Sequence, residues 1–200
     1  MDKFIETFGA LPFIEDVRDY RLKKITKAED FPAEFTLDKV AVKSQGSVGS
    51  CVAHSVAEII EYHNQKQEKN TLLMSTGFIY GNRRNSSSKT SGMYIREALS
   101  NACKYGDVYK ADFNENKEVP EAIELFEQRF DALKDKAYPN RFSTYFRLTS
   151  DDEIKRALMS YGPVIFAVDW RADAKVDSDG VLHLDSKKEK TGGHCMIIYG

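Results

Sequence analysis

A glycine-rich turn leads directly into the longest helical pattern of this chain. Residues 45–51 read Gln-Gly-Ser-Val-Gly-Ser-Cys, and the two glycines allow a sharp change of chain direction. Apolar residues then recur every three or four positions, at Val52, Ala53, Val56, Ala57, Ile59 and Ile60. This spacing predicts an amphipathic helix from residue 51 to about residue 67, with Ser50 as its N-cap and Cys51 in its first turn.

Helical patterns dominate the earlier part of the chain, and strand patterns dominate its end. The further predicted helices cover residues 72–82, 93–105, 119–136 and 151–161, the last of them opened by a capping-box pattern at Ser150. The strand-like runs cover residues 163–170, 180–184 and 194–199. Because the two kinds of element are segregated, we predict an α+β fold with a helical half at about 45–136 and a β-rich half at about 137–200.

Bulk properties exclude several classes of protein. A net charge of −2 over 200 residues gives no reason to expect nucleic acid or an anionic membrane as a partner. No apolar run approaches the ~20 residues that span a bilayer, and the N-terminus does not resemble a secretory signal. The three cysteines, Cys51, Cys103 and Cys195, are odd in number and widely spaced, which argues against a disulfide framework and favours a cytoplasmic location.

The position of Cys51 suits nucleophilic chemistry. An ordinary thiol titrates near ~8.5, whereas a helix N-terminus favours the thiolate through its dipole and free N–H groups. His194 lies 143 residues later, at the predicted start of the last strand, and an imidazole could act there as base and acid. The Gln45 amide and the Cys51 backbone N–H could together hold a developing oxyanion.

These segments resemble the papain-like cysteine peptidases. Residues 45–53 resemble the segment around the active-site cysteine, residues 193–196 resemble the histidine strand, and residues 31–38 and 161–164 also agree. The resemblance covers residues 31–200 and is weak in the middle. It implies a papain-like α+β fold with the active-site cleft between the halves, peptide or protein substrates, and no cofactor or metal.

The resemblance also implies a role for particular residues. Cys51 would be the nucleophile, His194 the acid and base, and Gln45 the oxyanion donor. Gly49, Gly92 and Gly193 would contact the substrate, with the Gly92 backbone pairing with a bound peptide. The metal-like run Asp177-Ser178-Asp179-Gly180 lacks the later ligands of a calcium loop and is interpreted as a turn.

The chain departs from the family pattern at three places. Val52 replaces the aromatic residue after the cysteine, and Val48 replaces a cysteine that usually forms a disulfide. The asparagine that orients the histidine is expected 15–20 residues past it, but the sequence ends at Gly200, so the C-terminal part of the fold is expected to be missing. Two other functions therefore stay open: an impaired or truncated module that binds peptides, and a thiol acyltransferase or amidase.

Residues 1–30, which we call the N-terminal arm, precede the papain-like domain predicted at 31–200. In this family such segments often act as inhibitory pro-regions in the cleft, and a structural strap around the β-rich half is equally compatible with the sequence. His54, three residues after Cys51, is a rival base, although a packing role is the simpler interpretation. The sequence does not indicate an oligomeric state.

Overall fold

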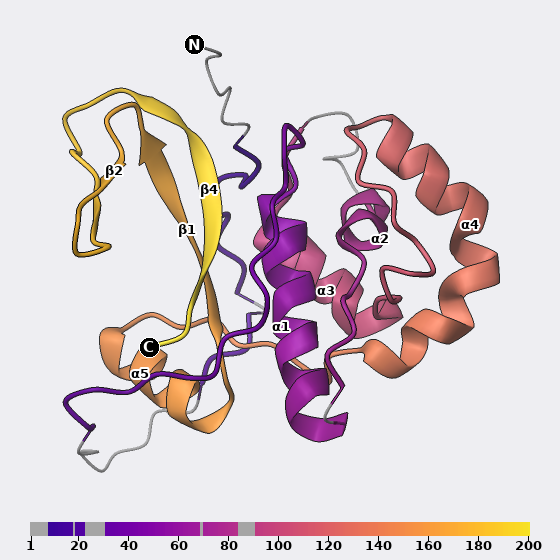
Figure 1. Cartoon of the computed structure of the whole chain (residues 1–200), viewed down its shortest axis with the longest axis horizontal. Helices are drawn as coiled ribbons and strands as arrows, with labels where there is room; N and C mark the ends of the chain where they lie inside the picture. Colours follow the sequence, from indigo (N-terminus) through magenta and orange to yellow (C-terminus); the bar gives the residue numbers. More distant parts are fainter. Residues whose placement is uncertain (1–7, 18, 23–30, 69, 84–90) are drawn as a thin grey trace.

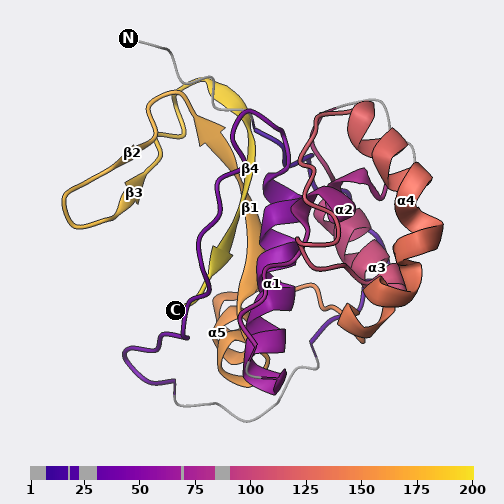
Figure 2. The ribbon, with the colours of Figure 1, turned by 45° about the vertical axis from the view of Figure 1, so that its right-hand side comes forward.

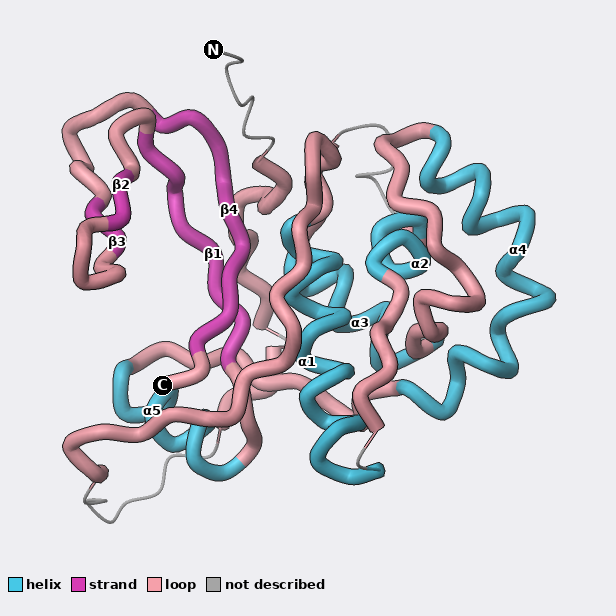
Figure 3. The backbone as a smooth tube through the Cα atoms, viewed as in Figure 1, coloured by secondary structure: helices cyan, strands magenta, loops and turns pink. Residues whose placement is uncertain are grey.

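The computed structural model describes residues 8–17, 19–22, 31–68, 70–83 and 91–200. Most of the helices gather on one side of the molecule, and a twisted pair of long strands stands on the other with the last helix below it (Figures 1 and 3). The helices are α1 (Cys51–Glu68), α2 (Thr76–Gly81), α3 (Ile95–Tyr105), α4 (Glu121–Ala137), η1 (Tyr138–Asn140) and α5 (Asp151–Ser160). The strands are β1 (Val164–Arg171), β2 (Lys175–Val176), β3 (Leu182–His183) and β4 (Lys190–Ile198). The predicted α+β architecture with two unlike halves is confirmed.

Helix α1 lies at the centre and joins the two halves. Its apolar residues are almost fully buried among α2, α3 and β4, as the three-to-four-residue spacing predicts. Cys195 of β4 belongs to the same buried cluster, so the helix packs directly on the strand. A second cluster, built on Phe78, Phe113 and Phe126, fills the space between α2 and α4. The thiol at the start of α1 is therefore placed at the junction of the halves.

The β-rich half is built on one antiparallel pair. Strands β1 and β4 pair with Val168 opposite His194, and the register shifts between Trp170 and Arg171. Strands β2 and β3 form a short hairpin that projects away from the body of the molecule (Figure 2). Asp177 shapes its turn, since one carboxylate oxygen accepts from the N–H groups of Asp179 and Val181. This run is therefore a turn, as predicted.

The segment before the glycine-rich turn is anchored to α1 by a buried ion pair. The Lys43 ammonium donates to the Glu61 carboxylate, whose other oxygen accepts from the Met74 N–H at 2.6 Å. Burial raises the pKa of Glu61, while the hydrogen bond and charge of Lys43 act in the opposite direction. The pair fixes the chain two residues before Gln45.

Local signals predicted the starts of α1 and α5 correctly. The Ser75 hydroxyl caps α2 by accepting from the Phe78 N–H, and the Ser150 hydroxyl caps α5 by accepting from the Glu153 N–H. The second helix is shorter than predicted because residues 72–75 lead into it without helical structure. No helix in the described part of the chain is long and apolar enough to cross a membrane.

Candidate active site

Cys51 is the first residue of α1 and is only 2% exposed. The Ser50 carbonyl accepts from the His54 N–H at 3.0 Å, which makes Ser50 the last residue before the helix, as predicted. The Ser50 hydroxyl, however, lies 3.2 Å from Nδ1 of the His54 ring. That ring nitrogen is also 3.0 Å from the Ser50 carbonyl oxygen. His54 is therefore held against its own helix terminus, which favours its packing role.

His194 lies on β4, the strand that packs against α1. The structure places it in the middle of the strand, because β4 begins at Lys190 and not at His194 as predicted. Its ring is packed edge-on against Trp170, with a centroid separation of 5.0 Å. The next residue, Cys195, is buried in the cluster around α1. Strand pairing and the Trp170 ring together fix the plane of the imidazole.

Cys51, His194 and Gln45 line one cavity of about 620 Å³. The cavity lies between the segment before the turn, α1 and the end of β4. The Gln45 amide nitrogen donates to the Val48 carbonyl at 3.0 Å, inside the turn that precedes Cys51. The structure thus brings together a thiol, an imidazole and a side-chain amide that lie up to 149 residues apart in the sequence.

The N-terminal arm passes beside Cys51, between Met93 on one wall and Gly193 on the other. We call the region between these two residues the groove. In Figure 1 its described residues run between β4 and α1. The Ala10 N–H donates to the Gly193 carbonyl at 2.8 Å, the Met93 N–H donates to the Gly9 carbonyl at 2.6 Å, and the Leu11 N–H donates to the Met93 carbonyl at 3.1 Å. The arm is therefore bonded to both walls of the groove. None of its described residues lines the cavity.

Three glycines allow this close approach. A Cβ on Gly9 would stand 1.9 Å from the Gly49 carbonyl oxygen, and a Cβ on Gly92 would stand 2.8 Å from the Gly9 carbonyl oxygen. Gly92 also has a φ of +89°, which side chains rarely adopt. A Cβ on Gly193 would stand 2.1 Å from the Ala10 carbonyl oxygen. At these three glycines the arm, the cysteine turn and the groove edge therefore approach one another through backbone atoms.

The covered thiol is not activated in this state. Burial raises the pKa of the Cys51 thiol, although backbone hydrogen bonds from Cys195 and Gly9 lower it. The sequence alone predicts a lowered pKa from the helix terminus, and that prediction does not hold for this form. The difference arises because the arm and β4 keep water from the sulfur, which penalises the thiolate.

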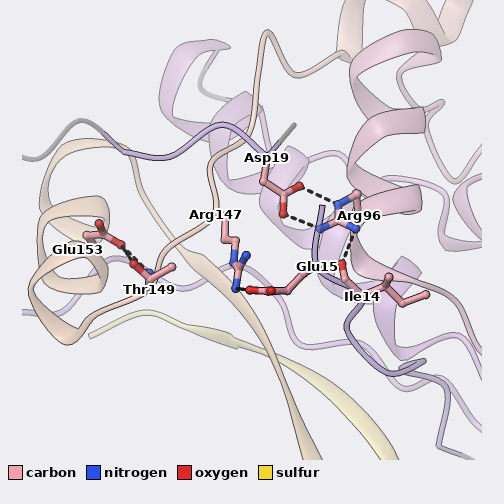
Figure 4. A network of polar contacts seen from close by, with 7 residues as sticks. All are labelled: Ile14, Glu15, Asp19, Arg96, Arg147, Thr149 and Glu153. Carbon is pink, nitrogen blue, oxygen red and sulfur yellow. Dashed lines mark hydrogen bonds and ion pairs between the residues drawn. The ribbon is translucent and has the colours of Figure 1, made fainter. Parts of the chain in front are cut away.

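Two arginines from different halves hold the outer part of the arm (Figure 4). Arg96 of α3 makes a double hydrogen bond with the Asp19 carboxylate and also donates to the Ile14 carbonyl at 2.6 Å. Arg147, which precedes α5, pairs with Glu15 at 3.1 Å. Both guanidinium groups also lie over the Phe13 ring, with Arg96 5.2 Å and Arg147 4.6 Å from its centroid. We call this set of contacts the arginine clamp.

Replacing Arg96 by glutamine is expected to loosen the arm. The change removes a two-pronged charge-assisted bond to Asp19, and such bonds contribute about 1.5–3 kcal/mol. We expect alkylation of Cys51 by iodoacetamide, measured by mass spectrometry of the Cys51 peptide, to accelerate about fivefold or more. Arg129→Gln is the matched control, because Arg129 pairs with Glu115 and does not contact the arm. Equal rates in both variants would contradict a holding role for the clamp.

The three glycines predicted to contact the substrate make different contacts in the structure. Gly193 offers its carbonyl to the arm, as a substrate-contacting residue would. Gly92 does not pair with the arm backbone itself, because its N–H points to the Tyr80 hydroxyl at 3.3 Å and the neighbouring Met93 makes the backbone bonds. Gly49 donates its N–H to the Glu118 carboxylate at 2.8 Å. Sequence reasoning missed Met93, Tyr80 and Glu118, which lie where the family resemblance is weak.

The fold and the arrangement of the site together define a class of protein. A thiol at a helix start and an imidazole on a strand line one cavity at the junction of two unlike halves, an arrangement that suits nucleophilic thiol catalysis. The described residues hold no group of three or more histidine, cysteine or acidic side chains that could bind a metal. The model of the papain family of cysteine proteases matches residues 33–200. The chain belongs to that family.

Individual relatives agree with this assignment. An uncharacterized peptidase C1-like protein, L477, of Acanthamoeba polyphaga mimivirus is 29% identical over 177 residues, which cover 78% of this chain and 54% of the viral protein. The chain thus spans about half the length of the curated relative that it matches.

Two solved structures share the fold. Xylellain, a cysteine protease from Xylella fastidiosa, superposes with a TM-score of 0.76 at 19% identity, covering 96% of this chain and 79% of its own. Digestive procathepsin L 3 of Tenebrio molitor gives a TM-score of 0.63 at 17% identity, covering 98% and 61%.

Proposed function

We propose that this chain is a cysteine peptidase in which Cys51 is the nucleophile and His194 the general acid and base. The observation that carries the proposal is the convergence of Cys51, His194 and Gln45 on one cavity. In the reaction, the Cys51 sulfur attacks a peptide carbonyl, and the imidazolium protonates the leaving amine. Water activated by the same imidazole then releases the acyl group and restores the thiol.

The oxyanion would form near the start of α1. The Cys51 N–H and the Gln45 amide are the donors we assign to it, and the helix dipole adds favourable positive potential there. In this form the Gln45 amide donates to the Val48 carbonyl. The amide therefore has to share or change its partner when substrate binds.

We further propose that the N-terminal arm keeps the peptidase latent. It takes the backbone bonds of Met93 and Gly193 that an extended peptide would need, and burial holds the Cys51 pKa above its ordinary value. Two of the similar solved structures, from Tenebrio molitor and Trypanosoma congolense, are procathepsins by name. The arm also contacts both halves, so it acts as a pro-segment and a strap together.

The direct test measures cleavage and labelling on the same protein after residues 1–22 are removed. We expect the shortened chain to hydrolyse an unfolded protein such as reduced casein, and stoichiometric iodoacetamide labelling of Cys51 to stop hydrolysis. Fast labelling without cleavage would point to an acyltransferase or amidase. Slow labelling, equal to that of an ordinary thiol, together with retained peptide binding would point to a peptide-binding module.

A further inference from the structure

A partly buried acidic residue, Glu118, ties together the two backbone segments that border the groove. The Glu118 carboxylate accepts from the Gly49 N–H at 2.8 Å with one oxygen. Its other oxygen accepts from the Tyr80 hydroxyl at 2.5 Å and from the Val119 N–H at 3.1 Å. Gly49 lies two residues before Cys51, so this single side chain is bonded to the turn that presents the thiol.

Tyr80 extends the link to the opposite segment. Its side chain is fully buried, and its hydroxyl accepts from the Gly92 N–H at 3.3 Å while donating to Glu118. Gly92 directly precedes Met93, whose N–H and carbonyl hold the backbone of the arm. A continuous chain of hydrogen bonds therefore runs from the cysteine turn through Glu118 and Tyr80 to the groove edge.

The charge state of Glu118 supports this link. Burial raises its pKa, but the hydrogen bonds from Gly49 and Tyr80 outweigh that effect and the pKa is lowered overall. The carboxylate thus stays ionised to lower pH than an ordinary glutamate, and charge-assisted bonds are the stronger kind. No disulfide joins the two segments, since all three cysteines of the chain are free.

The cysteine turn at Gly49 and the groove edge at Gly92 are packed closely against each other. A Cβ on Gly49 would stand 2.3 Å from the Ser91 hydroxyl oxygen and 3.2 Å from the Gly92 nitrogen. Small displacements of either segment would therefore change where Met93 offers its bonds relative to the Cys51 sulfur. The distance between Met93 and the Cys51 sulfur matters for peptide binding, because one substrate must bond to the Met93 backbone and reach the thiol at the same time.

We propose that Glu118 is a positioning residue that, through Tyr80, fixes the groove edge at Gly92 and Met93 relative to the Cys51 turn. The proposal rests on the proposed peptidase function. Glu118 does not touch the reacting atoms. It acts by keeping preformed the backbone bonds that a substrate, like the arm, takes from Met93. Its loss is therefore expected to weaken substrate binding more than it slows the chemical step.

The kinetic test uses the full chain with the arm displaced by Gly9→Val. Glu118→Gln keeps an oxygen acceptor without charge. Tyr80→Phe removes the hydroxyl that bonds both Glu118 and Gly92 but leaves the bond between Glu118 and Gly49. The exposed Glu121→Gln is the matched control. We expect KM for a peptide substrate to rise about fivefold or more in the first two variants, with kcat within about twofold, and no change in the control. An unchanged KM, or a fall in kcat at constant KM, would overturn the proposal.

A second readout needs no catalysis, so it separates this proposal from the peptidase function. In the chain with its native arm, the ¹⁵N-glycine amide signal of Gly49 should move with pH as Glu118 titrates, and this movement should vanish in Glu118→Gln. Alkylation of Cys51 should also be faster in Glu118→Gln because the arm loses its fixed partner at Met93. If no variant cleaves peptides, these two results still support the positioning role. A pH-independent Gly49 signal with unchanged alkylation refutes it.

Discussion

Replacing Gly9 by valine is expected to open the groove and to raise the alkylation rate of Cys51 about tenfold or more. The added side chain would collide with the Gly49 carbonyl oxygen, which lies 1.9 Å from the position of a Cβ. The arm would then lose its bonds to Met93 and Gly193, and each tenfold shift in the open population needs only about 1.4 kcal/mol. Every residue of the papain-like domain stays unchanged in this variant.

The pH dependence of Cys51 alkylation is expected to change when the arm is displaced, and the direction of the change can be worked out. While the arm is in place, burial raises the Cys51 pKa, so little thiolate exists at neutral pH. Displacing the arm admits water and leaves the helix dipole and an imidazolium to act, so the alkylation midpoint should move to lower pH. The measurement is the Cys51 alkylation rate from pH 5 to 10, with casein hydrolysis followed in parallel.

A neighbouring arm position provides the control for this result. Val17 is fully exposed, so Val17→Ala should change neither rate. Partly exposed Cys103 reports in the same spectra whether the fold as a whole has loosened. If Gly9→Val and Val17→Ala gave the same slow labelling, the arm would not be the element that protects the thiol.

Replacing His194 by alanine in the Gly9→Val background is expected to lower kcat/KM by about 10²–10⁴. This is the usual contribution of a general acid and base, and here the same group also stabilises the thiolate. Cys51→Ser should leave no measurable hydrolysis. The alkylation midpoint of Cys51 should rise in His194→Ala, because the positive partner is gone while the helix terminus remains.

Two further histidines test the assignment. His183 is exposed on the projecting hairpin and pairs with Asp177 at 2.7 Å, so His183→Ala should leave hydrolysis unchanged. His54 lies one helical turn from the thiol, and burial lowers its pKa. If His54→Ala removed activity while His194→Ala kept it, the base would be His54 and the cross-strand assignment would be wrong.

Local chemistry in the sequence was enough to predict the helical framework. The apolar spacing after Cys51 gives α1 almost to the residue, and the Ser150 hydroxyl caps α5 as its capping-box pattern predicts. These features depend on neighbours within about four positions, which a single sequence displays. The histidine strand was only partly predicted, because pairing with β1 draws Lys190 and two glycines into β4.

The remaining parts of the site depend on contacts that sequence spacing does not encode. Glu118 reaches Gly49 across 69 positions and Tyr80 across 38. The arm position depends on a junction of Gly9, Gly49 and Gly92, three residues that look like ordinary turn glycines when taken separately. The same nonlocal burial reversed the expected direction of the Cys51 pKa shift.

The arginine clamp and the glycine junction have a consequence for control of the protein in solution. If the arm inhibits as proposed, its local concentration stays constant however far the protein is diluted, because it is part of the same polypeptide, and dilution alone would not start hydrolysis. A single cut between the arm and the domain would change this, because the freed segment would then obey ordinary mass action and leave as its concentration falls. Latency would thus be independent of protein abundance before the cut and dependent on it afterwards.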